Sequence, residues 1–190
     1  GSFAQRGRSV SPITAIVPRL VRVVEQAREL GVLVVFIQNT TLPGGRSDSP
    51  AWLRLKTNHG LAPDYTLEGT WGQEILPELR PRTEEPVVRK HRSTAFVGTD
   101  LDLVLKSHGI ESIIITGVNT HACVEATARD GVYRDYYVVV LKDCVSAGDP
   151  ELHRAALKVM SHLMDVVSSE EVLDAWSRLS PVSPARTTIR

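Results

Sequence analysis

The sequence predicts an α/β fold: a doubly wound, mainly parallel sheet with helices on both faces. Short apolar runs alternate along the chain with segments of helical periodicity, and parallel strands need such helices as crossovers. The runs are continuous in hydrophobicity and rich in β-branched residues, which is typical of strands buried on both faces. We expect these strands at Val32–Ile37, Ser112–Thr116 and Tyr136–Leu141, with shorter ones at Pro86–Arg89 and Asp165–Val167.

Five helices are expected between and after these strands. The first follows from apolar residues at helical spacing, including Leu20, Val23 and Ala27, and Gly31 marks its end. Pro18 lies in its early part, so this helix is expected to begin near that proline. The predicted helices are Ile13–Leu30, Leu101–Ser107, Thr120–Tyr133, Glu151–Leu163 and Glu170–Leu179.

The 190 residues predict one domain, because domains usually span about 100–200 residues. We assign it to residues 1–179, followed by a linker-like tail at Ser180–Arg190. The segment Thr40–Glu85 interrupts the alternation, with little periodicity and two of the three tryptophans. Loops of this length usually have a function. We expect this excursion either to line a pocket as a lid or to pack on a partner subunit.

The composition excludes several classes of protein. Lys and Arg number 22 and Asp and Glu number 22, so the formal net charge is zero, which argues against nucleic acid and anionic membranes as partners. Two cysteines do not make a disulfide framework, and this favours a cytoplasmic protein. The apolar runs are much shorter than the roughly 20 residues of a membrane helix, and the polar N-terminus does not resemble a secretory signal.

Chemistry is expected at the carboxyl ends of the parallel strands. Three segments qualify: Gln38–Asn39, Lys90–Arg92 and Gly117–Cys123. With Thr120 as the predicted N-cap, Cys123 lies in the first turn of a helix, where the dipole and unpaired N–H groups stabilise a thiolate. A cation from Lys90 would add to this effect. A thiolate, a cation and free amide donors together suit acyl transfer.

Each of these residues also has a purely structural interpretation. A free cysteine is often a small buried hydrophobe; this is the prediction for Cys144, whereas Cys123 stays open from position alone. Lys90 fits an ordinary surface lysine equally well. The histidines are scattered, so a structural zinc site is not expected, and Gly44–Gly45 lacks the residues of a phosphate-binding loop.

The segment from Thr116 to Asp130, TGVNTHACVEATARD, resembles the signature of the isochorismatase-like cysteine hydrolases, TG-x-x-T-x-x-CV-x-x-T-x-RD. The resemblance extends over nearly the whole chain. It implies a parallel sheet of six strands and a catalytic Asp–Lys–Cys triad, with Cys123 as the nucleophile and Lys90 as the lysine. Val140–Asp143, followed by Ala147–Gly148, matches a later strand and loop of the family.

The aspartate of that triad has no counterpart in this sequence. In the family it ends the first strand, and Gly1–Phe3 resembles the segment that follows that strand. Doubly wound folds usually open on a strand, yet here a polar loop leads directly into a helix. We therefore expect the aspartate and its strand upstream of Gly1, with the present sequence truncated.

Single residues separate the subgroups of the family. Gln38–Pro43 stands where nicotinamidases carry an Asp and two His as metal ligands, so neither a metal nor any other cofactor is expected. Cys123 argues for amide chemistry, since isochorismatases proper generally lack the cysteine. The closest resemblance is to ureidoacrylate amidohydrolases, and it rests on Phe36–Asn39, Gly69–Trp71, Lys90–Arg92 and Thr99–Asp102.

The resemblance implies cleavage of a small carbamoyl or amide compound through a thioester on Cys123. The oxyanion donors are the backbone N–H groups of Asn119 and Cys123, next to a cis peptide between Val118 and Asn119. We hypothesise that Asn39, Trp71 and Arg92 contact the substrate as amide partner, apolar wall and carboxylate clamp.

Several alternatives stay open at this stage. N-carbamoylsarcosine, biuret, triuret and maleamate are other candidate substrates within the family. A redox-sensing protein and a catalytically dead binding protein are alternatives from other classes. The only partners expected are a small-molecule substrate and further copies of the chain, as a dimer or tetramer.

Overall fold

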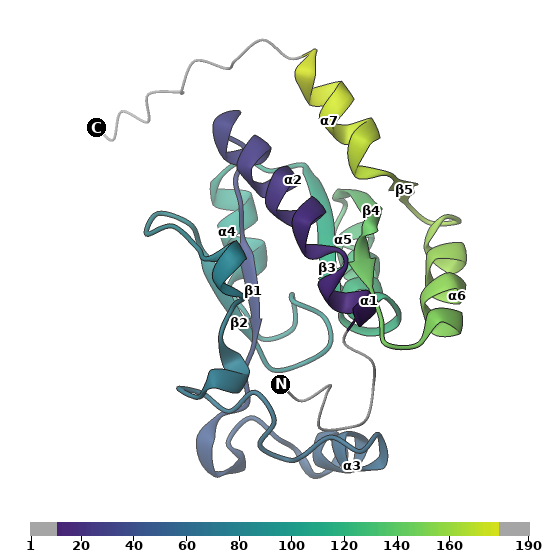
Figure 1. Ribbon diagram of the computed structural model, residues 1–190. Helices are drawn as coiled ribbons and strands as arrows, with labels where there is room; N and C mark the ends of the chain where they lie inside the picture. Colours follow the sequence, from purple (N-terminus) through teal and green to yellow (C-terminus); the bar gives the residue numbers. More distant parts are fainter. Residues whose placement is uncertain (1–10, 179–190) are drawn as a thin grey trace.

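The computed structural model describes residues 11–178, so the predicted tail and the Gly1–Phe3 segment lie outside the described residues. Five parallel strands form two sheets (Figure 1). One sheet pairs β1 with β2, and the other has the order β3–β4–β5. The strands are β1 Phe36–Asn39, β2 Val87–Lys90, β3 Ser112–Val118, β4 Tyr137–Ser146 and β5 Asp165–Val167. The predicted α/β class with parallel strands is confirmed.

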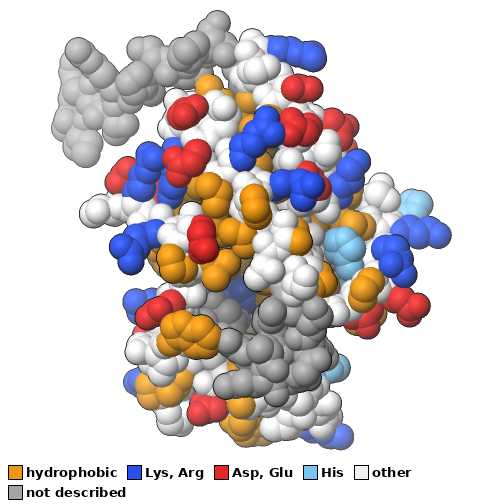
Figure 2. Space-filling view, in the orientation of Figure 1, with side chains coloured by type: hydrophobic (Ala, Val, Ile, Leu, Met, Phe, Trp, Pro, Cys, Tyr) orange, Lys and Arg blue, Asp and Glu red, His pale blue; other side chains and the backbone are white. Residues whose placement is uncertain are grey.

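No bridge joins β1 to β3 in the described part of the chain, although Val88 of β2 and Val138 of β4 belong to one hydrophobic core. The strand that the sequence analysis places upstream of Gly1 is outside the described residues. Apolar residues of both sheets stay partly exposed, among them Ile37, Val87 and Ile114. Figure 2 shows such hydrophobic side chains near the middle of one face, with charged side chains of both signs around them.

Helices cover both sides of the larger sheet, as expected for a doubly wound fold. α2 crosses in front of the strands in Figure 1, while α4 and α5 lie behind them. α2 begins one residue before Pro18, close to the predicted start. The helices are α1 Ser11–Thr14, α2 Val17–Glu29, α3 Pro50–Asn58, α4 Leu101–Ser107, α5 Glu125–Val132, α6 Pro150–Met160 and α7 Ser169–Ser177.

β4 separates two hydrophobic cores, because successive side chains of a strand point to opposite faces. Val138 and Val140 pack with residues of α4, α5 and α6. Leu141 packs on the other side with residues of α2 and α7. β4 therefore has a hydrophobic core on each face. It pairs with β3, the strand that leads to Cys123.

The first predicted strand, Val32–Ile37, is displaced in the structure. Only Phe36–Asn39 is paired, in register with Val87–Lys90. The partner strand begins after Pro86, whose carbonyl accepts the N–H of Phe36 at 2.9 Å. The hydrophobic run begins earlier than the strand, because pairing with β2 decides where the strand begins.

The excursion between β1 and β2 contains structure that the sequence analysis missed. It holds α3 and three single-turn 3₁₀ segments, at Pro43–Gly45, Trp71–Gln73 and Pro77–Leu79. Ser49 caps α3 by accepting the N–H of Trp52 at 3.2 Å. Serine followed by proline is an N-terminal helix signal that could have found this element. None of the described helices is both long and apolar enough to span a membrane.

Cys144 is the buried structural cysteine that the sequence predicts. Its side chain is inaccessible to solvent and belongs to the core beneath α2 and α7. Burial raises the pKa of its thiol from 9.0 to about 11. The thiol therefore stays protonated and unreactive at neutral pH.

We expect the stability of the fold to fall between about pH 9 and 11 because of Cys144. The folded protein keeps the thiol proton up to about pH 11, whereas the unfolded chain releases it near its ordinary pKa of 9.0. The stabilisation is complete below the lower value and is lost as the pH rises through the upper one. It corresponds to roughly 2–3 kcal/mol.

Denaturant unfolding of the wild type and of Cys144→Ala at pH 8 and pH 11 tests this expectation. The wild type should lose roughly 2 kcal/mol of unfolding free energy relative to the variant over that interval. An unchanged difference between the two proteins would contradict the assignment.

Candidate active site

Three segments at the carboxyl ends of parallel strands meet at one lysine. Asn39 ends β1 and lies opposite Lys90, the last residue of β2. The ammonium of Lys90 donates to Asn39 Oδ1 at 3.1 Å and to the carbonyl of Arg92 at 2.7 Å. It also donates to Cys123 Sγ at 3.3 Å. The structure thus brings together three residues that the sequence analysis selected separately.

Lys90 is 96% buried, which is unusual for a lysine without a carboxylate partner. None of the ion pairs between residues 11 and 178 includes it. A buried ammonium needs both hydrogen-bond acceptors and a counter-charge. Among the described residues its contacts are two neutral oxygens and the sulfur of Cys123. The ammonium is therefore placed to stabilise negative charge that develops on this sulfur when it attacks a carbon atom.

Cys123 lies on a π-helical turn, Thr120–Val124, which connects β3 to α5. The helix predicted over Thr120–Tyr133 begins at Thr120 as this π-turn and continues as α5. The prediction of Thr120 as its N-cap is wrong. Asn119 occupies the cap position without a side-chain cap hydrogen bond, and the Thr120 hydroxyl lies 2.8 Å from Nδ1 of His153. π-turns often occur at functional sites, where they re-aim a side chain.

His153, on α6, contacts this turn through the hydroxyl of Thr120. Burial lowers the pKa of its imidazole, and the nearby charges of Arg154 and His121 lower it further. The ring is therefore neutral at physiological pH, and its contact with the fully buried Thr120 carries no net charge. This contact joins α6 to the turn that holds Cys123.

Two residues of the recognised signature tie α5 to the segment after β2. The hydroxyl of Thr127 donates to the Cys123 carbonyl at 2.7 Å and accepts the N–H of Ala95 at 3.0 Å. Asp130 accepts from the hydroxyl of Thr94 at 2.6 Å. These bonds hold the turn that carries Cys123 against the segment that follows Lys90.

Of the remaining predicted site residues, Asn39 and Arg92 contact Lys90 and Trp71 does not. Asn39 uses both ends of its amide, since its Nδ2 donates to Thr66 Oγ1 at 2.9 Å. Trp71 lies on a 3₁₀ turn of the excursion with 69% of its surface exposed, and no described contact joins it to Cys123 or Lys90. The peptide bond between Val118 and Asn119 is cis.

Arg92 also lies beside the cluster, since its backbone carbonyl accepts from Lys90. Its guanidinium carbon is 4.9 Å from the ring centroid of Trp52, on α3. The sequence analysis selected Arg92 but missed Trp52, because the two are 40 positions apart in a segment without periodicity.

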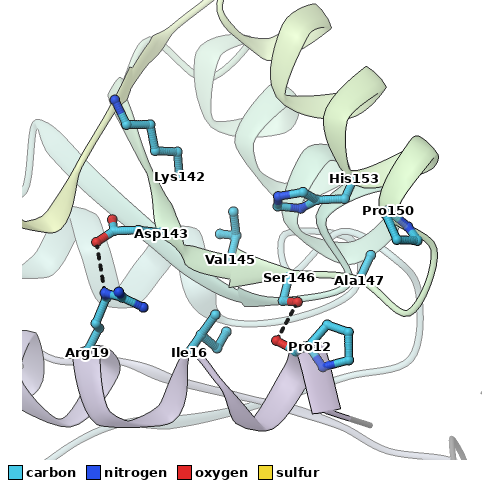
Figure 3. A pocket seen from close by; sticks show the side chains of 10 residues that line it. All are labelled: Pro12, Ile16, Arg19, Lys142, Asp143, Val145, Ser146, Ala147, Pro150 and His153. Carbon is cyan, nitrogen blue, oxygen red and sulfur yellow. Dashed lines mark hydrogen bonds and ion pairs between the residues drawn. The ribbon is translucent and has the colours of Figure 1, made fainter. Parts of the chain in front are cut away.

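A cavity of about 300 Å³ lies on the far side of the nucleophile turn, between α1–α2 and the end of β4. Figure 3 shows Arg19 paired with Asp143 on one side of it and the ring of His153 on the other. Neither Cys123 nor Lys90 lines this cavity. Within residues 11–178 no group of three or more His, Cys, Asp and Glu side chains is placed to hold a metal ion.

Comparison with known proteins adds to this geometry. Residues 2–171 match the isochorismatase domain. A ureidoacrylate amidohydrolase from Methylobacterium radiotolerans is 33% identical over 193 residues, which cover 94% of this chain and 75% of the relative.

Two solved structures show the same fold. An isochorismatase-like hydrolase from Alkaliphilus metalliredigens superposes with a TM-score of 0.77 at 30% identity, over 87% of this chain and 86% of the other. An N-carbamoylsarcosine amidase from Thermoplasma acidophilum superposes with a TM-score of 0.68 at 28% identity, over 85% of this chain and 87% of the other.

We expect Lys90→Met to slow alkylation of Cys123 by iodoacetamide at neutral pH. Methionine keeps the length of the side chain but removes the charge 3.3 Å from the sulfur. The negative charge on the attacking sulfur loses its nearby cation, so the rate should fall on the order of tenfold or more. The rate is measured by peptide mass mapping, which scores Cys123 separately from Cys144.

Arg89→Met is the matched control, since Arg89 lies on the same strand but is exposed and paired with Glu68. It should alkylate at the wild-type rate. An undiminished rate in Lys90→Met would show that the ammonium does not activate the sulfur.

Proposed function

This chain belongs to the isochorismatase domain family, and from that membership we propose that it is a cysteine-dependent amidohydrolase of small carbamoyl compounds. The observation that carries the proposal is the contact of 3.3 Å between the buried ammonium of Lys90 and Sγ of Cys123. A sulfur nucleophile with a cation beside it at the end of a parallel sheet is placed to attack a carbonyl carbon.

The proposed reaction proceeds in two steps. The sulfur of Cys123 attacks the carbonyl carbon, a C–S bond forms and the C–N bond breaks. The nitrogen leaves with an added proton as ammonia or an amine. Water then attacks the thioester, the C–S bond breaks, and the product acid or carbamate is released with the thiolate restored.

The resemblance in the sequence assigns the remaining roles. The oxyanion of each tetrahedral intermediate is held by the backbone N–H groups of Asn119 and Cys123, and each such donor contributes on the order of 3 kcal/mol. The third member of the triad is an aspartate that has no counterpart in this sequence. We therefore assign catalytic roles here only to Cys123 and Lys90.

We propose a ureidoacrylate-like compound as substrate. The support is the 33% identity to a ureidoacrylate amidohydrolase over 94% of this chain. The structural likeness to an N-carbamoylsarcosine amidase points to the same carbamoyl group. Asn39 and Arg92 stay predicted substrate contacts beside the cluster. Trp71 would contact a substrate as an apolar wall only if its exposed 3₁₀ turn closes on the site.

We expect Cys123→Ala to lose ammonia release from ureides while it keeps the fold, because alanine removes the nucleophile and leaves the backbone unchanged. Ammonia release is measured over ureidoacrylate, N-carbamoylsarcosine, biuret, maleamate and nicotinamide, and folding is checked by circular dichroism. Cys144→Ala is the control, since that thiol is buried and remote from Lys90, and it should keep the wild-type turnover.

Turnover that persists in Cys123→Ala would exclude the nucleophile assignment. Stoichiometric oxidation of Cys123 by peroxide without any ammonia release from the wild type would favour a redox protein instead.

A further inference from the structure

We propose that Arg92, Trp52 and Ser47 form a preassembled site for the carboxylate end of the substrate, positioned by a buried ion pair between Lys56 and Asp48. The inference rests on the proposed function and deepens it: a ureidoacrylate-like substrate carries an acid group, and the inference names the residues that hold Arg92 in place to bind it. Every member of this site except Arg92 comes from the excursion between β1 and β2.

The guanidinium of Arg92 is fixed on one edge and one face. Its Nη1 donates to the carbonyl of Ser47 at 2.8 Å and to the carbonyl of His91 at 2.7 Å. Its carbon lies 4.9 Å from the ring centroid of Trp52, which gives a cation–π contact. An arginine held in this way has lost most of its rotamer freedom before any ligand binds.

The opposite edge of this guanidinium is the part that suits a ligand. Among the described residues its hydrogen bonds all run through Nη1, and none of the ion pairs includes Arg92. Nε and Nη2 carry parallel N–H groups, the fork that binds both oxygens of a carboxylate. Arg92 thus has a fixed position and an unneutralised charge.

The backbone of Arg92 lies beside the reacting sulfur. The backbone carbonyl of Arg92 and Sγ of Cys123 both contact the same atom, Nζ of Lys90, at 2.7 and 3.3 Å. The proposal places the scissile carbonyl of the substrate at the sulfur and its acid group on the side chain of Arg92.

A buried ion pair holds the two supports of Arg92 in place. Nζ of Lys56 lies 2.7 Å from Oδ2 of Asp48, and both side chains are at least 95% buried. The same Nζ donates to Thr41 Oγ1 and to the carbonyl of Pro63, each at 3.2 Å. These bonds join the excursion to the residues that directly follow β1.

In the sequence Asp48 lies between Ser47, which contacts Arg92, and Ser49, which caps α3. Ser47 precedes it and supplies the carbonyl to Arg92. Ser49 follows it and caps the helix that carries Trp52. Buried ion pairs contribute little net stability compared with apolar residues of equal size. A pair at this position therefore serves to hold Ser47 and Trp52 in register with Arg92.

The test uses two alkylating reagents of the same shape that differ in charge. Iodoacetate carries a carboxylate where iodoacetamide carries an amide, and both react at Cys123. The charge of Lys90, 3.3 Å from the sulfur, favours iodoacetate in the wild type and in every variant that keeps this lysine. The change in the ratio of the two rate constants from wild type to variant therefore reports on the carboxylate site. Arg92→Gln should lower this ratio about tenfold, the loss of one charge-assisted pair of hydrogen bonds.

Three further variants separate the parts of the proposal. Arg92→Lys keeps the charge without the fork and should lower the ratio less than Arg92→Gln. Trp52→Leu should lower it several-fold, while Leu55→Ala, an exposed neighbour on α3, should leave it unchanged. The double variant Asp48→Leu with Lys56→Met should stay folded, because apolar residues of similar size fill the space of the ion pair. It should still lower the ratio, because the hydrogen bonds of Lys56 to Thr41 and Pro63 are lost.

Steady-state kinetics on an acid-bearing ureide gives the second readout. Trp52→Leu should raise KM several-fold and change kcat by less than about twofold, because it loosens binding without touching the reacting atoms. The same variant should leave KM unchanged for a neutral amide of the same length.

The outcomes distinguish the two proposals. If Cys123 does not react with iodoacetamide, the proposed function fails. If Cys123 reacts but the ratio in Arg92→Gln equals that of the wild type, the carboxylate site is overturned and the nucleophile stands. A wild-type ratio in the stable double variant would remove the positioning role of Lys56 and Asp48.

Discussion

A lysine ammonium buried where three strand-end segments meet is the interaction on which the rest of the site depends. Lys90 has 4% exposure, and its contacts are the side chain of Asn39, the carbonyl of Arg92 and the sulfur of Cys123. Each partner comes from a different part of the chain, so one cation orders all three. A buried charge is tolerated only where hydrogen-bond acceptors surround it, so these three neighbours must be aligned on the ammonium.

The excursion between β1 and β2 acts as an extension of the sheet edge rather than as a loose loop. The side chain of Gln73 donates to Thr40, and the pair of Lys56 with Asp48 reaches Thr41. Both anchors begin at the residues that directly follow β1. Because the same strand ends in Asn39, the position of the excursion and the position of Lys90 are set by one short piece of backbone.

Much of the fold and the centre of the site could be predicted from the sequence. The bounds that the sequence predicts for the helix Leu101–Ser107 and the strand Asp165–Val167 are the observed ones, since apolar runs and the stop at His108–Gly109 are local signals. The first strand was misplaced and α3 was missed. Pairing with β2 decided where the strand begins, and the contacts of Trp52 and Lys56 stabilise a helix that shows little periodicity.

The sequence by itself determined the alternation of strands and helices and the burial of Cys144, because these depend on local patterns. It also identified Cys123 and Lys90 as candidate site residues, because both follow predicted strands and match the family resemblance. Only the tertiary structure decided that Cys123 lies on a π-turn supported by His153, and that Trp52 faces Arg92. Those contacts join residues 33 to 40 positions apart. Their partners are selected by packing, and no pattern along the chain encodes such a distance.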